Sequence, residues 1–311
     1  MTLMRIKNRL TAAGMMLIAL SAMAAAVKDK IRVVATTPDL ASLAREIGGS
    51  EVDVVALAKP TEDPHFVDAK PSHIVTLNRA DVLIEGGAEL ELGWMPPLLE
   101  SSRNPKIAAG SPGRVVASQG VQMLEVPTSF DRAKGDVHSL GNPHFMIDPV
   151  NAKIIAASIA DHLSQVDPSG ASAFKANLAK FDATLDAKFA EWQKKLEPFK
   201  GAKIVTYHKD FPYLAERFHL EVVENLEPKP GIAPSPAHLA KVIQTMKATG
   251  AHVILVQPFQ NRKTAETVAR QTGAIVVDMP QQPGAKADTQ TYFTMMDNLV
   301  TTLATALGAQ K

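Results

Sequence analysis

Short apolar segments alternate with helix-like segments in both halves of the chain, and this alternation constrains the fold more than any other feature. Runs rich in β-branched residues predict buried strands at 31–37, 52–58 and 81–85, and again at 204–207, 221–226, 252–257 and 275–277. Strand–helix–strand units of this length favour parallel pairing with right-handed crossovers. The predicted fold class is therefore α/β, with two lobes, each a mostly parallel sheet flanked by helices.

A long amphipathic segment separates the two halves. Its apolar side chains recur at spacings of three and four residues from Phe174 to Trp192, which predicts one helix of about 40 Å at 1.5 Å per residue. Such a helix is a stiff connector and resists hinge bending. The predicted division is a signal peptide at 1–26, an N-terminal lobe at 27–167, a connecting helix at 168–198 and a C-terminal lobe at 199–311.

The N-terminal segment has the pattern of a cleaved secretory signal. Arg5, Lys7 and Arg9 precede the apolar stretch 10–22, and small residues follow it, although a short membrane anchor is the alternative. The chain contains no Cys, which leaves no lipid-modified Cys at the cleavage site, no disulfide and no thiolate ligand. We expect a periplasmic protein in which His and carboxylate side chains would bind any metal. The net charge of +1 gives no reason to expect a nucleic-acid partner.

Four polar side chains are candidates for one metal site between the lobes. His208 and Asp278 directly follow predicted strands, and ligands of open α/β sheets bind beyond the carboxyl ends of strands. His65 lies in the loop after the second strand, and His144 lies where the first lobe ends. Three imidazoles and one carboxylate suit tetrahedral Zn²⁺, although imidazole also binds other transition metals. A filled shell has no position for an activated water, which favours holding the ion over catalysis.

Each of these residues also has a structural interpretation. A single His after a strand is commonly a hydrogen-bonded polar residue, and Asp278 alone fits a turn. His138 is a fifth ligand, a contact of the loaded state, or a residue without a role. Asp148 fits the N-cap of the next helix, and either Glu62 or Asp63 fits an outer partner of the histidine beside it.

Several motifs in the same order resemble the periplasmic receptors of zinc and manganese ABC importers, a family with a TroA-like fold. Residues 63–72 are similar to the family's D-P-H-x-(Y/F)…P-S-D segment, 142–149 to its N-P-H-x-W-L-D-P segment, 207–211 to its Y-H-x-x-F strand end, and 227–236 to a Pro-rich family loop. The resemblance covers essentially the whole mature chain. It departs from the pattern at Met146, where the family usually has Trp, and at His73, where it has Asp.

The resemblance implies two α/β lobes joined by one long helix, with the metal between them. The family's ligand positions fall on His65, His144, His208 and Asp278. A His at the third position is linked to zinc and a Glu to manganese, so His208 points to Zn²⁺, with Mn²⁺ as the alternative. The implied function is that of a periplasmic zinc receptor, not an enzyme, which delivers its ion to an ABC permease of the inner membrane.

Three other functions compete with that of a zinc receptor. They are a manganese or iron receptor of the same fold, a zinc hydrolase with a base such as Glu62, and a surface adhesin of the same fold. We expect a monomer. Whether a metallochaperone loads the protein is left open by the sequence.

Overall fold

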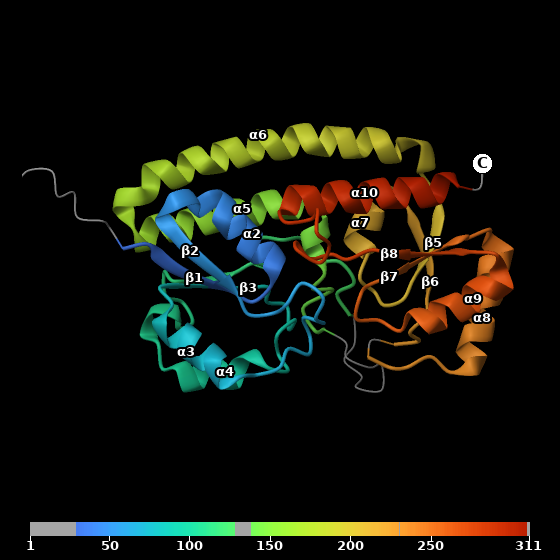
Figure 1. Cartoon of the computed structure of the whole chain (residues 1–311), viewed down its shortest axis with the longest axis horizontal. Helices are drawn as coiled ribbons and strands as arrows, with labels where there is room; N and C mark the ends of the chain where they lie inside the picture. Colours follow the sequence, from blue (N-terminus) through green and yellow to red (C-terminus); the bar gives the residue numbers. More distant parts are fainter. Residues whose placement is uncertain (1–28, 128–137, 230, 310–311) are drawn as a thin grey trace, which may run out of the picture. The chain divides into compact units, whose positions relative to one another are not determined.

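Two four-stranded sheets, each with all strands parallel, form the framework of the structure (Figure 1). This computed structural model describes residues 29–127, 138–229 and 231–309, so the predicted signal peptide lies outside the described residues. The first sheet has the order β2-β1-β3-β4 and the second the order β6-β5-β7-β8. The strands are β1 (Ile31–Ala35), β2 (Val52–Ala56), β3 (Val82–Glu85), β4 (Arg114–Val116), β5 (Lys203–Thr206), β6 (Glu221–Asn225), β7 (Val253–Val256) and β8 (Ile275–Asp278). The two lobes therefore share one topology, as the alternating pattern predicted.

Helices lie on both faces of each sheet. The α-helices are α2 (Pro38–Gly48), α3 (Pro71–Arg79), α4 (Met95–Ser102), α5 (Pro149–Val166), α6 (Ala171–Leu196), α7 (Pro212–Arg217), α8 (Pro236–Thr249), α9 (Arg262–Thr272) and α10 (Tyr292–Gly308). Short 3₁₀ turns are η1 (Gly49–Glu51), η2 (Pro105–Ile107), η4 (Phe145–Ile147), η5 (Pro168–Gly170) and η6 (Glu197–Phe199). None of the helices within the described ranges combines the length and the apolar character that a membrane crossing requires.

The strands alternate between two separate apolar layers, as the two-residue period of a strand demands. In β7, Val253 and Leu255 join a large core that extends through both lobes, whereas Ile254 and Val256 face a smaller core of the second lobe. In β3, Leu83 likewise faces a smaller core, here with residues of α3 and α4. Each lobe therefore has its own outer layer, and both contribute to one shared inner layer.

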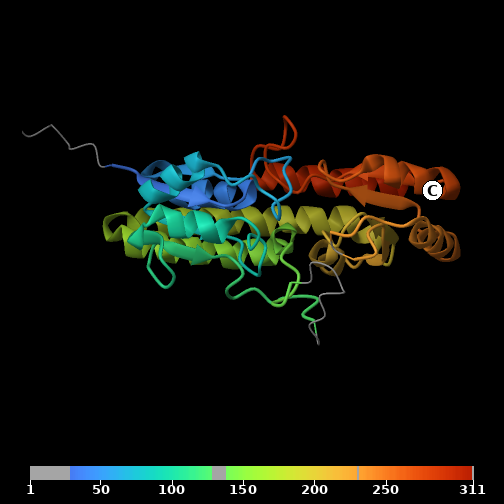
Figure 2. The same ribbon diagram turned by 90° about the horizontal axis from the view of Figure 1, so that it is seen from below.

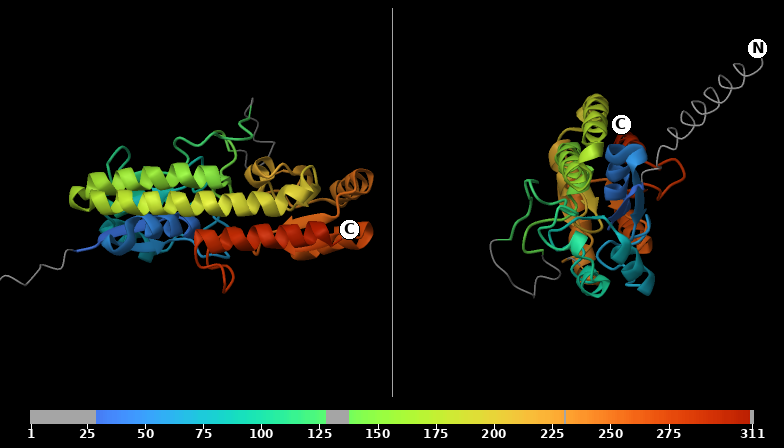
Figure 3. Two further views of the ribbon diagram at one scale, coloured as in Figure 1. Left: turned by 90° about the horizontal axis from the view of Figure 1, so that it is seen from above. Right: turned by 90° about the vertical axis from the view of Figure 1, so that its left-hand side faces the viewer.

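Helix α6 packs against elements of both lobes (Figures 1 and 3). It buries the apolar stripe that predicted it, Phe174, Phe181, Leu185, Trp192 and Leu196. The Asn177 side-chain amide donates to the Ile47 carbonyl of α2 at 2.9 Å, and Trp192 Nε1 donates to Asp297 Oδ1 of α10 at 2.7 Å. The predicted long connecting helix is thus confirmed, and it is attached to both lobes along its length.

Helix α10 also connects the two lobes. The Tyr292 backbone N–H donates to Ser42 Oγ at 2.8 Å, and the Tyr292 hydroxyl donates to the Met146 carbonyl at 3.1 Å. Figure 2 shows α10 beside the first lobe at its N-terminal end and beside the second lobe further along. The two sheets are thereby held by a common layer of helices, while the loops at their strand ends meet on the other side.

Candidate metal site

Three histidines from three separate loops converge between the lobes. His65 lies in the loop between β2 and α3, His144 directly precedes η4, and His208 follows β5. One ring nitrogen of each lies within 4.8 Å of the other two. The ring centroids are 5.1 Å, 5.4 Å and 5.9 Å apart, with interplanar angles of 62°, 84° and 75°. The steep mutual angles leave the three nitrogens close to one another without stacked rings, so the structure brings together all three predicted histidines.

The local backbone explains how His65 and His144 are held. The His65 N–H donates to Asp63 Oδ1 at 3.0 Å, and Trp94 Nε1 donates to the Pro64 carbonyl at 2.9 Å. The His144 N–H donates to Asn142 Oδ1 at 2.9 Å. A proline precedes each histidine and restricts the backbone before it. Both loops therefore present their histidines on stiff, hydrogen-bonded backbone.

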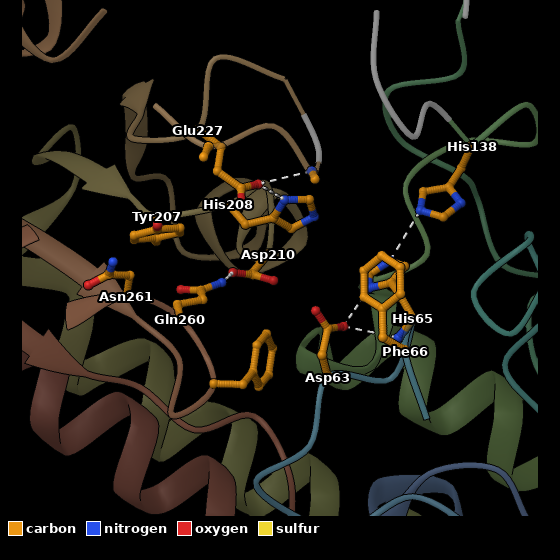
Figure 4. Close-up of a pocket in the computed structure, with 13 residues that line it drawn as sticks. Asp63, His65, Phe66, His138, Tyr207, His208, Asp210, Glu227, Gln260 and Asn261 are labelled. Carbon is orange, nitrogen blue, oxygen red and sulfur yellow. Dashed lines mark hydrogen bonds and ion pairs between the residues drawn. The ribbon is translucent and has the colours of Figure 1, made fainter. Parts of the chain in front are cut away.

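Two carboxylates each contact the Nδ1 atom of one histidine ring (Figure 4). His65 Nδ1 lies 2.9 Å from Asp63 Oδ1, and His208 Nδ1 lies 2.7 Å from Glu227 Oε2. A carboxylate at Nδ1 fixes the tautomer and leaves Nε2 with its lone pair for a metal. Of the two outer partners considered from the sequence, Asp63 is the one that contacts His65, whereas Glu62 accepts from the Lys59 N–H. The role of Glu227 was not predicted; its position in the loop after β6, the neighbour of β5 in the sheet, is the signal that could have found it.

A cavity of about 410 Å³ opens beside the histidines and is lined from both lobes (Figure 4). His65 and His138 lie on one side of it, and His208 and Asp210 on the other. His138 Nε2 lies 3.2 Å from His65 Nε2, and the two rings stack at 5.2 Å. The neighbouring Ser139 is bonded to Glu89 through both its N–H and its hydroxyl, which anchors the segment that carries His138.

The histidines differ in their tendency to bind a proton. Burial lowers the pKa of His144 well below its ordinary value, and the neighbouring imidazoles lower it further. Burial also lowers the pKa of His138, to about 4. Burial opposes protonation of His208 too, but the carboxylates of Asp210 and Glu227 outweigh it and raise the pKa of His208. Protons therefore compete for His208 before they compete for His144.

Asp278 lies elsewhere in the structure. It is the last residue of β8, its side chain is 56% exposed, and its carboxylate pairs with the Arg262 guanidinium. The structure does not bring Asp278 into the histidine group, so its role as a ligand stays a prediction. Among the described residues, Asp210 is an acid close to His144, and its Oδ1 lies 3.9 Å from His144 Nε2. Asp148 caps α5 by accepting from the Val150 N–H, as predicted.

Comparison with known proteins places this site in a family. The family model of the zinc-uptake complex component A, periplasmic, matches residues 33–306. A putative metal-binding protein of Treponema pallidum is 27% identical over 254 residues, covering 80% of this chain and 78% of the relative. An iron ABC transporter substrate-binding lipoprotein of Streptococcus pyogenes serotype M1 is 24% identical, covering 86% of each chain. A manganese ABC transporter substrate-binding lipoprotein of Streptococcus anginosus is also 24% identical, covering 90% of this chain and 91% of the relative.

Solved structures agree on the fold. A crystal structure of ZnuA superimposes with a TM-score of 0.75 at 23% identity, covering 90% of this chain and 100% of that one. A zinc-bound deletion mutant of ZnuA gives 0.76 at 24% identity, covering 91% and 100%. The manganese-bound periplasmic metal-binding protein of Candidatus Liberibacter asiaticus gives 0.74 at 20% identity, covering 89% and 100%. At these identities the likeness establishes the fold.

The match of the family model spans both sheets, all three histidines and the helix between the lobes. The chain therefore belongs to the zinc-uptake complex component A family, whose members are substrate-binding receptors of metal ABC transporters and not enzymes.

Proposed function

We propose that this protein is a zinc receptor, which captures Zn²⁺ between its two lobes and delivers it to an ABC importer. The observation that carries the proposal is the group of three imidazole nitrogens within 4.8 Å of one another, supplied by His65, His144 and His208. Two nitrogens that each lie about 2.0–2.1 Å from one Zn²⁺ are about 3.4 Å apart at a tetrahedral angle, so the three rings need only a small movement to close around one ion. We propose these three residues as ligands.

Zinc is favoured over manganese by the chemistry of the donors. Mn²⁺ prefers carboxylate, carbonyl and water oxygens, whereas imidazole suits Zn²⁺, and Mn²⁺ binds nitrogen sites least tightly of the divalent first-row metals. Two carboxylates near the site, Asp63 and Glu227, contact histidine Nδ1 atoms and are thereby placed as outer partners. Some relatives are named as iron or manganese transporter lipoproteins, so these two metals are the alternatives to zinc as the bound ion.

The proposed route of the ion begins in the periplasm. The signal-like N-terminus supports export there, and we propose that 1–26 is cleaved and that the mature protein is a monomer. The ligands bind the metal when deprotonated. Since the ligands come from loops of both lobes, we propose that the permease releases the ion by loosening the loops of one lobe. Loading by a metallochaperone is compatible with this route.

A titration tests the choice of metal. Zn²⁺ and Mn²⁺ are titrated separately, by calorimetry, into the demetallated protein at one fixed pH. We expect one site per chain and a dissociation constant at least tenfold lower for Zn²⁺, a difference of about 1.4 kcal/mol. Equal affinities, or tighter Mn²⁺ binding, would contradict the proposed zinc receptor and favour its manganese counterpart.

Growth under metal limitation tests delivery. A strain without this chain should stop growing under zinc chelation, and the wild-type gene should restore growth. The His208→Ala gene should not restore it, whereas the His162→Ala gene should, because His162 lies on α5 and contacts the Pro112 carbonyl. Restoration by added Mn²⁺ instead of added Zn²⁺ would refute the assignment of zinc as cargo.

A further inference from the structure

Asp210 is a buried acid whose position the three-histidine site does not explain. It lies two residues after His208, and its side chain is 1% exposed. Its Oδ2 accepts from Gln260 Nε2 at 2.6 Å, and its backbone carbonyl accepts from Gln281 Nε2 at 3.0 Å. Gln260 is fixed in turn, because its Oε1 accepts from the Gln257 N–H at 2.8 Å. The loop after β7 thus holds one oxygen of the Asp210 carboxylate in place, and the loop after β8 holds the Asp210 backbone.

The other carboxylate oxygen is directed at the histidines. Asp210 Oδ1 is buried and has no hydrogen-bond partner among the described residues, and the same is true of His144 Nε2. The two atoms are 3.9 Å apart, which is too far for a hydrogen bond. Leaving a buried polar atom unpaired is costly, and more so when the group is charged. A ligand between these two atoms would give both of them a partner.

One metal ion satisfies both atoms. Two donors that are each about 2.0–2.2 Å from the same Zn²⁺ lie about 3.4 Å apart at a tetrahedral angle. A separation of 3.9 Å is close to this value. Asp210 Oδ1 is not part of the group whose atoms all lie within 4.8 Å of one another, so the carboxylate must turn toward the histidines when the ion binds. Rotation about the Asp210 side-chain bonds supplies such a movement.

Each of the other nearby acids is already paired through one oxygen with a histidine ring or with Arg262. Among the described residues that line the cavity, the carboxylates are Asp63, Asp210 and Glu227, and the first and last contact histidine Nδ1 atoms. Asp278 pairs with Arg262 and is half exposed. Three neutral imidazoles leave the full charge of a divalent cation unbalanced in a buried site, where isolated charge is costly. A carboxylate at the ion reduces that charge.

We propose that Asp210, and not Asp278, supplies the fourth ligand of the metal through Oδ1. This inference rests on the proposed function of the three-histidine site and assigns its remaining position. It also gives the segment after β5 two ligands, His208 and Asp210, so that this one segment of the second lobe provides half of the ligands.

Isosteric variants test the assignment. Asp210→Asn and Asp278→Asn are titrated with Zn²⁺ by calorimetry beside wild type and His208→Ala, with each fold checked by circular dichroism. We expect Asp210→Asn to bind at least tenfold more weakly than wild type, a loss of about 1.4 kcal/mol or more. Asp278→Asn should bind within about twofold of wild type, because its carboxylate pairs with Arg262. If Asp278→Asn is the weakened variant, the assignment is wrong.

The His208→Ala variant distinguishes a failure of the Asp210 assignment from a failure of the proposed function. Loss of binding in His208→Ala with unchanged binding in Asp210→Asn overturns the role of Asp210 and leaves the zinc receptor intact. Unchanged binding in both variants places the metal elsewhere and overturns the proposed function as well.

A measurement on the wild type does not depend on the folding of any variant. In a crystal structure of the zinc-loaded protein, we expect an Asp210 oxygen at about 2.0–2.2 Å from the ion. An ion bound by the three histidines and a water or Asp278, with both Asp210 oxygens beyond bonding distance, would overturn the proposal.

Discussion

His208 is the residue through which acid should first weaken metal binding. The carboxylates of Asp210 and Glu227 raise the pKa of His208, whereas burial lowers the pKa of His144. A metal binds only the deprotonated ring, so the proton on His208 must leave first. As the pH falls through the raised pKa of His208, a growing fraction of the protein carries this proton, and the affinity for Zn²⁺ falls.

Glu227→Gln should move that pH dependence. Without the carboxylate the pKa of His208 is lower, so the loss of affinity on acidification should begin at a lower pH than in wild type. At alkaline pH the variant should bind about 10–100-fold more weakly, because His208 loses the acceptor that orients it and increases its basicity. Zn²⁺ titrations from about pH 8 to about pH 5.5, across the usual range of His, measure both effects.

Glu224→Gln is the matched control for this prediction. Glu224 lies on β6, the strand before the loop that holds Glu227, but it pairs with Lys241, away from the metal-site histidines. Its titration should follow wild type at every pH. If Glu227→Gln shows the same onset of weakening as wild type, then Glu227 does not control the proton on His208.

The sequence predicted the three histidines and offered Asp63 as an outer partner, but it did not single out Glu227 or Asp210, for a physical reason. His65, His144 and His208 each stand at a strand end or in a Pro-His-Phe segment, and both patterns are local. Asp278 also stands at a strand end, but β8 is an edge strand, and Arg262 of the adjacent helix is available to its carboxylate. The role of Asp210 was not predictable from the sequence, because its orientation depends on Gln260 and Gln281, which are 50 and 71 residues away along the chain.

At the scale of elements, one short segment couples the loop of His144 to the second lobe. Asn142 is buried, and its amide donates to Glu125 Oε2 and to the Lys209 carbonyl, each at 2.9 Å. Its Oδ1 accepts from the His144 N–H, and its own carbonyl accepts from the Tyr213 hydroxyl of α7 at 2.7 Å. The side chain and the backbone of Asn142 thus both connect the loop of His144 to the second lobe.

Asn142→Ala should weaken both the fold and the metal site. It leaves the His144 N–H and the Lys209 carbonyl without their partner, which should lower the free energy of unfolding by about 1–3 kcal/mol. Because His144 is no longer held against the second lobe, we also expect weaker Zn²⁺ binding. Denaturant unfolding of the demetallated protein and Zn²⁺ calorimetry measure the two effects separately.

Asn78→Ala provides the comparison. Asn78 donates to the Ser102 carbonyl within the first lobe, so its loss should lower stability and leave the affinity for Zn²⁺ unchanged. Equal affinities for Asn142→Ala and Asn78→Ala would show that Asn142 has no part in placing His144.

Most elements were predictable because their patterns are local, and the exceptions are irregular. Helix α6 ends at Leu196, where its apolar stripe ends. Within 111–126 the described structure has only the short β4, Arg114–Val116, and three residues are too few for the period of a strand to show in the sequence. The following residues run as turns toward Asn142 and bond to it and to Tyr213, contacts that no period in the sequence reveals.

At the scale of the whole molecule, the two lobes share a core. One apolar cluster contains residues of β1, α2, α5, α6, β7 and α10. The predicted boundaries at 168 and 198 describe the chain path, but they do not divide this core. A protein whose lobes share their inner layer should unfold as one cooperative unit.

Single-tryptophan variants test this cooperativity. The chain has two Trp residues, Trp94 in the outer core of the first lobe and Trp192 on α6. In Trp94→Phe and in Trp192→Phe, the fluorescence of the remaining Trp should follow the same denaturant transition as far-ultraviolet circular dichroism. Separate midpoints for the two probes in either variant would mean that the lobes unfold independently, as two domains divided by the connecting helix.

Zn²⁺ calorimetry of the demetallated wild type, beside His208→Ala and His162→Ala, tests whether three histidines form one metal site between the lobes. We expect one site per chain in wild type and in His162→Ala, with affinity at least tenfold lower in His208→Ala, a loss of about 1.4 kcal/mol or more. If His208→Ala binds Zn²⁺ as tightly as wild type, the metal does not bind between the lobes at His65, His144 and His208.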